Sequence, residues 1–422
     1  MSKLQIKFLG GAREVGRNAI AVKAKKTQVL LDYGVMLNHT PGFPMHISPK
    51  EVDAIILTHS HLDHSGAVPI FYIHGKKTLF ANRLNAELNE LLIRDFIHLS
   101  SYYLPFEYLE LNSMMKNSRH VDFKTHKKVG DITFQLLNAG HIPGSAQVLI
   151  EAEGRRLLYT GDFNIEDTRL LKGATMEFDE PLDAVIIEST YANDEHTPRQ
   201  ELEKRFVAEI TETIEHGGTV LVPAFGVGRS QEIACVLAAY HFPYPVTIDG
   251  MIRGANTIML NNGEFLRDHK LLKEALNSAY WIKGWKDRRK AAKKPGVIIS
   301  TAGMLKGGPA AFYISKIGKK TSNAVFLVSY QIEGTPGRQL LDKGICLMNG
   351  KIKKIKAKVG HFDFSSHCGA TELKESVKRL KGSPEIYVIH GEEENCRLFT
   401  RWIKKEMGLK AKAPKTGYTA KI

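Results

Sequence analysis

The order of the predicted elements indicates a layered α/β fold. In the first half of the chain, short apolar runs bounded by turn residues predict closely spaced strands, with helical segments such as 86–98 between them. From about Thr197 the chain changes to regular alternation, with helices predicted at 199–215 and 230–240 and a buried strand at 219–223. Strands that alternate with helices form mostly parallel sheets. We therefore expect helices covering sheets, with a mostly parallel sheet in the middle of the chain.

The predicted strands suggest more than one domain. They are Gln5–Phe8, Ala19–Val22, Gln28–Leu31, Ala54–Leu57, Thr133–Leu137, Gln147–Glu151, Arg156–Tyr159, Ala184–Ile187, Thr219–Pro223, Gly296–Ser300, Val325–Ser329, Lys351–Lys358 and Glu385–Ile389. A chain of 422 residues is longer than one hydrophobic core usually supports. The polar residues needed to complete the site of the first half of the chain appear only near the end of the chain. We expect a first domain at 1–193, an inserted domain at 194–350, and a return to the first domain at 351–422.

Composition and charge narrow the class of protein. Hydrophobic residues make up 43% of the chain and charged residues 25%, which is typical of a globular protein. The start, Met1–Gly10, resembles neither a signal peptide nor a membrane span, so we expect a cytoplasmic protein without membrane contact. The cysteines show no paired spacing, which argues against a thiolate metal site. The formal charge of +14 favours a polyanionic partner, although a lysine-rich solvated surface would give the same charge.

A dense group of histidines follows the predicted strand Ala54–Leu57. His59, His61, Asp63 and His64 lie in a loop at the carboxyl end of that strand, where α/β proteins commonly build their sites. His59 and His61 can point the same way if the loop is extended, whereas Asp63 and His64 must diverge. One short segment can therefore serve two metal ions, and imidazoles with a carboxylate suit zinc.

Two later residues extend this group. His141 lies among glycines after a predicted strand, and Asp162 follows the strand Arg156–Tyr159. Each alone would more often be a turn or hydrogen-bonding residue, but the histidine group upstream makes both candidate ligands. Asp32 follows the strand Gln28–Leu31, where a simple turn aspartate is equally consistent with the sequence.

Taken in order, these motifs resemble the metallo-β-lactamase fold, an αββα sandwich. The resemblance implies two metal sites, with His59, His61 and His141 in one, Asp63, His64 and His390 in the other, and Asp162 bridging them. Asp32 corresponds to the early aspartate of the family, which supports the ligand loop through hydrogen bonds.

A two-metal site of this kind suits phosphodiester hydrolysis. Two ions about 3.5–4 Å apart can clamp the attacking and leaving oxygens, and zinc lowers the pKa of a bound water to about 7. The departing alkoxide still needs a proton. His367 is a candidate general acid, and Glu188, at the end of the strand Ala184–Ile187, is a candidate partner that keeps its imidazole oriented and protonated. We therefore predict catalytic roles for Asp162, Glu188 and His367.

These additions narrow the resemblance to the β-CASP branch of the metallo-β-lactamase fold, which processes nucleic acids. Glu188, His367 and His390 correspond to motifs A, B and C of that branch, and a histidine at motif C is typical of members that act on RNA. Ser60 and Ser65 are similar to those of the cleavage and polyadenylation specificity factor type. The short segment before the first strand leaves no room for the KH domains of longer archaeal relatives. The chain therefore resembles the short archaeal form.

The resemblance implies an activity, cofactors and partners. We expect a ribonuclease with two Zn²⁺ per chain and no further small-molecule cofactor. It would cut RNA internally and, as a second mode, degrade RNA from the 5′ end. Hydrolysis would take place between the two domains. We also expect a homodimer that associates through the terminal segment Trp402–Ile422.

Several residues are candidate RNA contacts. They are Arg229 and Ser230 in a glycine-rich turn, Arg338 in a comparable turn, Ser365 and Ser366 before His367, and Trp285 and Lys286 in a stretch that combines tryptophans with many cations. Stacked bases and cradled phosphates would use such residues. Ordinary turns and an amphipathic helix with buried indoles are equally consistent with the sequence.

Two other functions stay open at this point. A small-molecule hydrolase such as a thioesterase of the glyoxalase II type would share the metal site, but it gives no reason for the basic insert or for His367. A non-catalytic RNA-binding subunit is the second alternative, because this branch includes members that have lost metal ligands.

Overall fold

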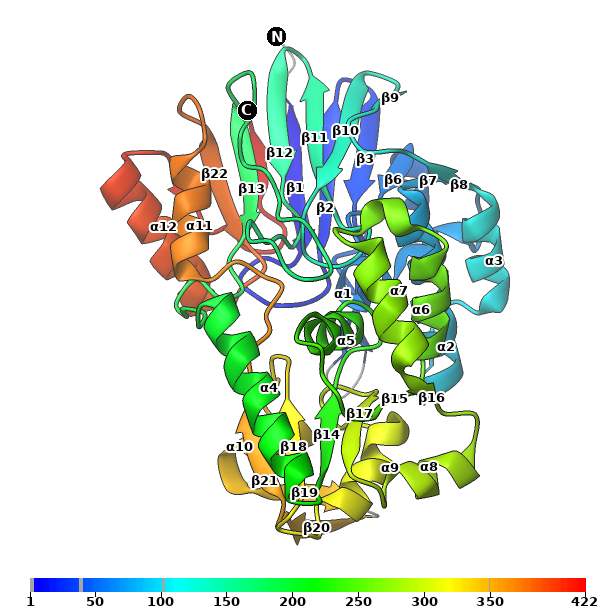
Figure 1. Ribbon diagram of the computed structural model, residues 1–422. Coiled ribbons are helices and arrows are strands. Elements are labelled where there is room, and N and C mark those ends of the chain that lie inside the picture. The colour runs from blue at the N-terminus through cyan, green and yellow to red at the C-terminus, as the bar shows by residue number, and fades with distance from the viewer. Residues whose placement is uncertain (1–3, 38–40, 101–102, 349) are drawn as a thin grey trace. The chain divides into compact units, whose positions relative to one another are not determined.

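The structure is a computed structural model that describes residues 4–37, 41–100, 103–348 and 350–422. Within these residues the chain divides into two compact units, which are described one at a time. The first contains Met1–Asp167, Lys172–Glu195 and Ser366–Ile422, and the second contains Thr168–Leu171 and His196–Ser365. Figure 1 labels the helices and strands and shows their order along the chain by colour.

Two mixed β-sheets form the centre of the first unit. The strand orders are β24-β1-β2-β3-β6-β7-β8 and β23-β22-β13-β12-β11-β10-β9. The strands are β1 Gln5–Gly10, β2 Ala19–Ala24, β3 Thr27–Leu31, β6 Ala54–Ile56, β7 Thr78–Ala81, β8 Ser118–His120, β9 His126–Val129, β10 Ile132–Asn138, β11 Ala146–Ala152, β12 Arg155–Tyr159, β13 Ala184–Glu188, β22 Glu385–Ile389, β23 Ala411–Lys412 and β24 Thr419–Lys421. In the first sheet β3, β6, β7 and β8 run parallel, and in the second β12, β13, β22 and β23 do.

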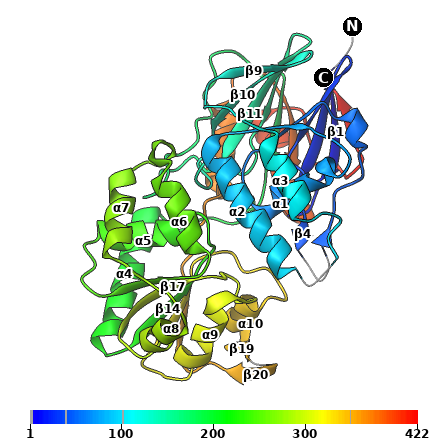
Figure 2. The ribbon, with the colours of Figure 1, turned by 90° about the vertical axis from the view of Figure 1, so that its right-hand side faces the viewer.

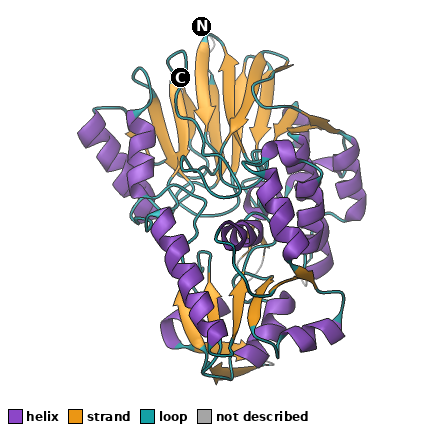
Figure 3. Cartoon of the chain, in the orientation of Figure 1, coloured by secondary structure: helices purple, strands orange, loops and turns teal. Residues whose placement is uncertain are grey.

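Helices cover the outer faces of both sheets. They are η1 Pro49–Glu51, α1 Leu62–Ser65, η2 Val68–Tyr72, α2 Arg83–Leu99, α3 Tyr108–Lys116, α11 Ala370–Lys378 and α12 Glu393–Met407, and a small hairpin is formed by β4 Met36–Leu37 and β5 Pro41–Gly42. The helices α2 and α3 pack on the first sheet (Figure 2), and α11 and α12 pack on the second (Figure 3). Phe8 of β1 and Phe134 of β10 are buried in the apolar layer between the sheets. The predicted αββα sandwich is therefore confirmed.

The second unit is built on a parallel sheet of order β16-β15-β17-β14-β18-β21. Its elements are α4 Arg199–Glu215, β14 Thr219–Pro223, α5 Arg229–Ala239, β15 Val246–Asp249, α6 Ile252–Leu260, η3 Gly263–Phe265, α7 His269–Ser278, β16 Tyr280–Trp281, α8 Trp285–Ala291, β17 Gly296–Ser300, α9 Gly308–Ile317, β18 Ala324–Leu327, α10 Pro336–Lys343, β19 Ile345–Met348, β20 Lys351–Lys354 and β21 Lys358–His361. Val325 and Leu327 of β18 pack with Tyr313 of α9, whereas Phe326 contacts Phe206 of α4 on the other face. The predicted mostly parallel sheet is thus confirmed.

The structure differs from the prediction of one strand at Lys351–Lys358, because this stretch contributes to two strands. β20 pairs with β19 in a hairpin, and β21 pairs with β18 at the edge of the parallel sheet. The break falls at Ile355, which is buried in the core of the second unit while its N–H bonds to Gly344. Because β21 joins this sheet, the second compact unit continues to Ser365, and the first unit resumes at Ser366. Within the described part of the chain, no helix is long and apolar enough to cross a membrane.

Candidate metal centre

The candidate ligands lie at the carboxyl ends of strands in the first unit. The neighbouring parallel strands β3 and β6 are followed by Asp32 and by His59. The strands β12, β13 and β22 are also parallel neighbours. Asp162 follows β12, Glu188 is the last residue of β13, and His390 follows β22. Carboxyl ends of adjacent parallel strands meet at one edge of a sheet. Residues far apart in the sequence are brought together in this way.

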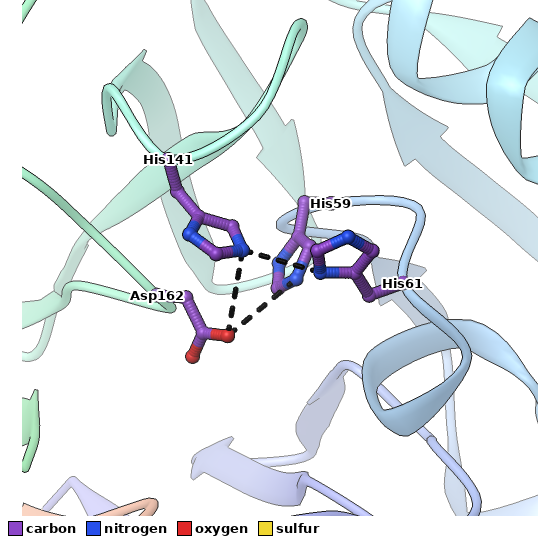
Figure 4. A group of neighbouring side chains, drawn as sticks. All are labelled: His59, His61, His141 and Asp162. Carbon is purple, nitrogen blue, oxygen red and sulfur yellow. Dashed lines mark hydrogen bonds and ion pairs between the residues drawn. The ribbon is translucent and has the colours of Figure 1, made fainter. Parts of the chain in front are cut away.

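The first group of candidate ligands consists of His59, His61, His141 and Asp162 (Figure 4). Asp162 Oδ2 lies 3.6 Å from His59 Nε2 and 3.8 Å from His141 Nε2. His141 Nε2 lies 3.2 Å from His61 Nδ1. All four residues thus turn one polar atom toward a common point.

The second group consists of Asp63, His64, His390 and the same Asp162. Here the other carboxylate oxygen of Asp162, Oδ1, faces the histidines, at 3.3 Å from His64 Nε2 and 3.0 Å from His390 Nδ1. His390 Nε2 lies 3.3 Å from Asp63 Oδ2. Asp162 therefore presents one oxygen to each group, which is the arrangement required of a bridging ligand.

The chemistry of the first group fits a divalent metal ion. Burial lowers the pKa of His61 to about 4, and it lowers the pKa of His59 and His141 well below the usual range, so these imidazoles are neutral near pH 7. Burial raises the pKa of Asp162, but the positive charges of His390 and His64 outweigh this effect and hold its pKa low. Neutral imidazole and ionised carboxylate are the forms that bind metals.

A buried nitrogen gives a second test of this fit. His59 Nε2 is buried, and among the described residues no hydrogen bond reaches it. The distance of 3.6 Å to Asp162 Oδ2 is too long for one. Buried polar atoms without hydrogen bonds are rare because they are costly, unless they ligate an ion. The donor atoms of each group lie within 4.8 Å of one another, so the residues present suit such an ion.

Asp32 supports the ligand loop through a network of hydrogen bonds. Its carboxylate accepts bonds from the Thr58 N–H at 2.8 Å, the Thr58 hydroxyl at 2.7 Å and the Tyr159 hydroxyl at 3.0 Å, and it lies 2.7 Å from His64 Nδ1. Burial lowers the pKa of His64, but Asp162 and Asp32 outweigh it and raise that pKa well above its usual value. Asp32 is therefore more than a turn residue, because it fixes the orientation of the His64 ring.

Glu188 and His367 form a pair beside the two groups. The carboxylate oxygens of Glu188 lie 2.9 and 3.0 Å from His367 Nδ1, although the residues are 179 positions apart in the sequence. Glu188 also accepts bonds from the Phe163 N–H at 2.8 Å and the Thr190 hydroxyl at 2.5 Å. Burial lowers the pKa of His367, but the Glu188 charge outweighs burial and raises it to about 9. The imidazole is thus oriented and carries a proton near neutral pH.

Sequence reasoning missed several residues that hold the site. They are Thr58 and Tyr159, which bind Asp32, Asn18, whose side-chain nitrogen lies 3.0 Å from His64 Nε2, and Thr190, which binds Glu188. Each lies in or near a predicted strand or beside a motif residue, where the sequence alone gives no sign of its contact. Only the adjacency of Thr58 to His59 and of Thr190 to Glu188 was a usable signal.

The candidate RNA contacts are placed unequally. Ser366 belongs to the first unit, where its carbonyl oxygen lies 2.9 Å from His141 Nδ1, so it orients a candidate ligand. In the second unit Ser230 is buried and its hydroxyl donates to Gly226, which leaves no surface for RNA. Arg338 pairs with Asp342 at 2.8 Å.

The other candidate contacts of the second unit also differ in exposure. Arg229 is partly buried and Ser365 is buried. Trp285 and Lys286 are exposed on α8, so the alternative of buried indoles does not apply to Trp285.

Comparison with known families agrees with this architecture. The sequence matches the Metallo-beta-lactamase superfamily over residues 12–206 and the Beta-Casp domain over 230–340. This chain belongs to the β-CASP group of the metallo-β-lactamase superfamily. Residues 352–414 of this metallo-β-lactamase protein match a further family, described as a Zn-dependent metallo-hydrolase RNA specificity domain. The predicted resemblance is therefore confirmed.

Archaeal relatives match this β-CASP chain over nearly its whole length. RNase aCSPSF2 of Saccharolobus solfataricus is 40% identical, and the alignment covers 98% of this chain and 84% of that relative. Probable RNase MJ4 of Methanocaldococcus jannaschii is 34% identical over 99% of this chain and 100% of its own. A crystal structure titled as a protein of unknown function from Enterococcus faecalis V583 has a TM-score of 0.64 at 13% identity and covers 100% of both chains, which shows likeness of fold.

Proposed function

We propose that this protein is a metal-dependent ribonuclease that hydrolyses RNA phosphodiester bonds. The observation that carries the proposal is Asp162, whose two oxygens face separate ligand groups beside the Glu188–His367 pair. The relatives named as RNases, which match the chain almost end to end, support RNA as the substrate. The RNA specificity domain match and the charge of +14 favour the same polyanion.

The proposed cofactor is two Zn²⁺ per chain. His59, His61 and His141 would hold one ion, Asp63, His64 and His390 the other, and Asp162 both. When bound, the ions supply Lewis-acid activation of water and neutralise charge that develops on the phosphate. The histidine-rich donor sets favour zinc over magnesium or calcium, which prefer oxygen ligands.

The proposed acid is His367. Glu188 holds Nδ1 of its imidazole, which leaves the other ring nitrogen to carry a proton toward the leaving alkoxide. His367→Gln should lower kcat by about 10²–10⁴-fold while the metal content stays that of the wild type. A phosphodiester substrate with a good leaving group needs no acid, so the variant should cleave that substrate nearly as well as the wild type does. Equal losses on both substrates would contradict the role of an acid.

The activity itself is tested with labelled RNA. Wild-type protein should cleave RNA and leave a thioester substrate intact, and Asp162→Ala should stop cleavage while RNA binding persists. Cleavage by Asp162→Ala at the wild-type rate would overturn the metal assignment. Turnover of the thioester without RNA cleavage would favour the small-molecule hydrolase, and metal content near zero with intact RNA binding would favour a non-catalytic subunit.

The mode of cleavage is part of the proposal. We propose internal cutting, with degradation from the 5′ end as a second mode. A circular RNA has no end, so products from a circle require internal cutting. Comparison of 5′-labelled and 3′-labelled linear RNA separates the second mode, because degradation from the 5′ end releases the 5′ label as mononucleotides at once.

We further propose a homodimer and a cytoplasmic location. Within the terminal segment Trp402–Ile422, β23 and β24 are the edge strands of the two sheets of the first unit. Edge strands keep unpaired backbone groups that a second chain can use. Light scattering after gel filtration should give twice the chain mass of 47.2 kDa, and a monomer at micromolar concentration would contradict the dimer.

A further inference from the structure

An exposed tryptophan on α8 is held in place by its neighbours. Trp285 is 57% exposed, although an exposed indole forgoes the stabilisation that burial would give. The Arg288 guanidinium lies 5.0 Å from the centre of the Trp285 ring, and the Phe312 ring of α9 meets it edge-on at a centroid distance of 5.4 Å. Figures 1 and 2 both show α8 beside α9. The indole is therefore fixed by two contacts while more than half of its residue surface faces solvent.

Arg288 is itself anchored in the second unit. Its Nε and Nη2 donate to the carboxylate of Asp249 at 2.7 and 3.0 Å, and the Tyr313 hydroxyl donates to the same carboxylate at 2.8 Å. Asp249 is buried at the end of β15. The charge of Arg288 is therefore already compensated, and its role is to position Trp285. A side chain ordered before binding loses less conformational entropy on binding.

A row of cations lies on the same helix. Lys286, Arg289 and Lys290 are exposed, and the last two follow Lys286 by three and four residues, so both are its neighbours on the helix surface. Among the described residues none of the three forms an ion pair with a carboxylate. From Trp281 to Lys294 the sequence holds seven lysines and arginines and one acid, Asp287, which accepts a backbone N–H at the start of α8. The row thus keeps a net positive charge, with Asp287 as the one acid of this stretch that acts on it.

We propose that Trp285, with the cation row Lys286, Arg289 and Lys290, is a binding platform for single-stranded RNA. One base stacks on the open indole, and the cations contact phosphates of the strand on either side of it. Every nucleobase has a π-face, so the platform accepts any sequence, and each phosphate contact releases counterions. An acidic protein surface would match the charges but would offer the indole no planar base. The inference rests on the proposed function, because RNA is taken as the substrate.

The stacking is tested by binding of a fluorescent single-stranded RNA in the Asp162→Ala background, which keeps the strand intact. Trp285→Ala should weaken binding about tenfold, and Trp285→Phe should weaken it less. A strand of the same length without bases should bind both proteins equally. Tyr103→Ala removes a 90% exposed aromatic residue of the first unit and should leave the affinity unchanged. Circular dichroism checks that each variant is folded.

The phosphate contacts are tested by salt. The double variant Lys286→Ala with Arg289→Ala should lower the slope of log Kd against log salt by about 1.4, or roughly 0.7 for each lost contact to a single strand. Trp285→Ala should leave the slope unchanged. The matched control, Lys127→Ala with Lys128→Ala on exposed β9, removes the same charge and should not alter the slope.

Two results would overturn the platform. One is a Trp285→Ala protein that binds RNA as the parent does, and the other is an equal loss for strands with and without bases. If Trp285→Ala leaves RNA binding unchanged and the wild type cleaves RNA in a metal-dependent way, the platform is rejected and the proposed function stands. Loss of binding in Trp285→Ala without any cleavage by the metal-loaded wild type would support the platform and reject the proposed function.

Discussion

Backbone conformation at the site is unusual at two residues. Asp32 has φ of 57° and His390 has φ of 47°, in the left-handed region that residues with a Cβ rarely adopt. Such a conformation costs roughly 1–2 kcal/mol, and Asp tolerates it better than His does. The surrounding strands enforce it in both cases, since His390 N–H bonds to Gly11 and Asp32 N–H to Ile56. The turn aims each side chain at the ligand groups.

The two groups predict different metal losses on substitution. Asp63 belongs only to the second group, whereas Asp162 belongs to both. Elemental analysis should therefore give about two metals per chain for the wild type, about one for Asp63→Ala and fewer for Asp162→Ala. A full metal complement in Asp162→Ala, or the same content in Asp63→Ala as in the wild type, would contradict the shared carboxylate.

The hydroxyl of Tyr159 should matter to both stability and metal binding. Tyr159→Phe removes one of the bonds to Asp32, which leaves a buried acceptor short of a donor. We expect about 1–2 kcal/mol lower unfolding free energy and at least tenfold weaker metal binding in a chelator competition. Tyr387→Phe is the matched control, because that buried tyrosine lies on β22 away from Asp32 and should lower stability without changing metal affinity.

At the scale of elements, helix α5 of the second unit binds a short segment that is distant from it in the sequence. Glu232 of α5 accepts the N–H groups of Arg169 and Leu170 at 3.0 and 2.8 Å and forms an ion pair with Arg199. The segment Thr168–Leu171 is counted with the second unit although its neighbours in sequence belong to the first. This carboxylate thus fixes the segment that follows the Asp162 loop.

Loss of that carboxylate should destabilise the protein measurably. Glu232→Gln removes the ion pair with Arg199, which keeps a longer one with Glu203, and leaves one buried N–H without an acceptor, so the unfolding free energy should fall by about 2 kcal/mol. Glu212→Gln, on the exposed face of α4, removes a long ion pair with Lys358 and should change stability by less than about 0.5 kcal/mol. Urea unfolding followed by circular dichroism measures both. Equal stability of the two variants would contradict the role given to Glu232.

Elements differed in how well their sequences predicted them. Regular alternation predicted the strand 219–223 and the helix 199–215 with the bounds that the structure has. The stretch Lys351–Lys358 misled because lysines and apolar residues mostly alternate in it, with only the pair Lys353 and Lys354 out of step. The break depends on Ile355 entering a core formed by distant residues. The periodicity of a short segment carries no information about which strand it will pair with.

The whole molecule explains why the candidate site was only partly predictable. His59, His61, Asp63 and His64 lie within six residues, so their spacing alone indicated a metal site. The pairing of Glu188 with His367 depends on a chain that leaves the first unit, builds the second and returns. The need for a general acid and the resemblance to a family suggested this pair, but the spacing of the two residues did not. Support by Thr58 and Tyr159 lay outside both kinds of reasoning, since hydroxyls on buried strands have many possible partners.

Metal-dependent cleavage tests the two-metal site most directly. The protein is stripped with a chelator, its metal content is measured, and single-turnover cleavage of a labelled RNA is followed as Zn²⁺ is added back. We expect no cleavage by the stripped protein and activity that rises with zinc until about two ions per chain are bound. Cleavage that persists in protein free of metal, or a fully loaded and folded protein that leaves RNA intact, would contradict a metal-dependent ribonuclease.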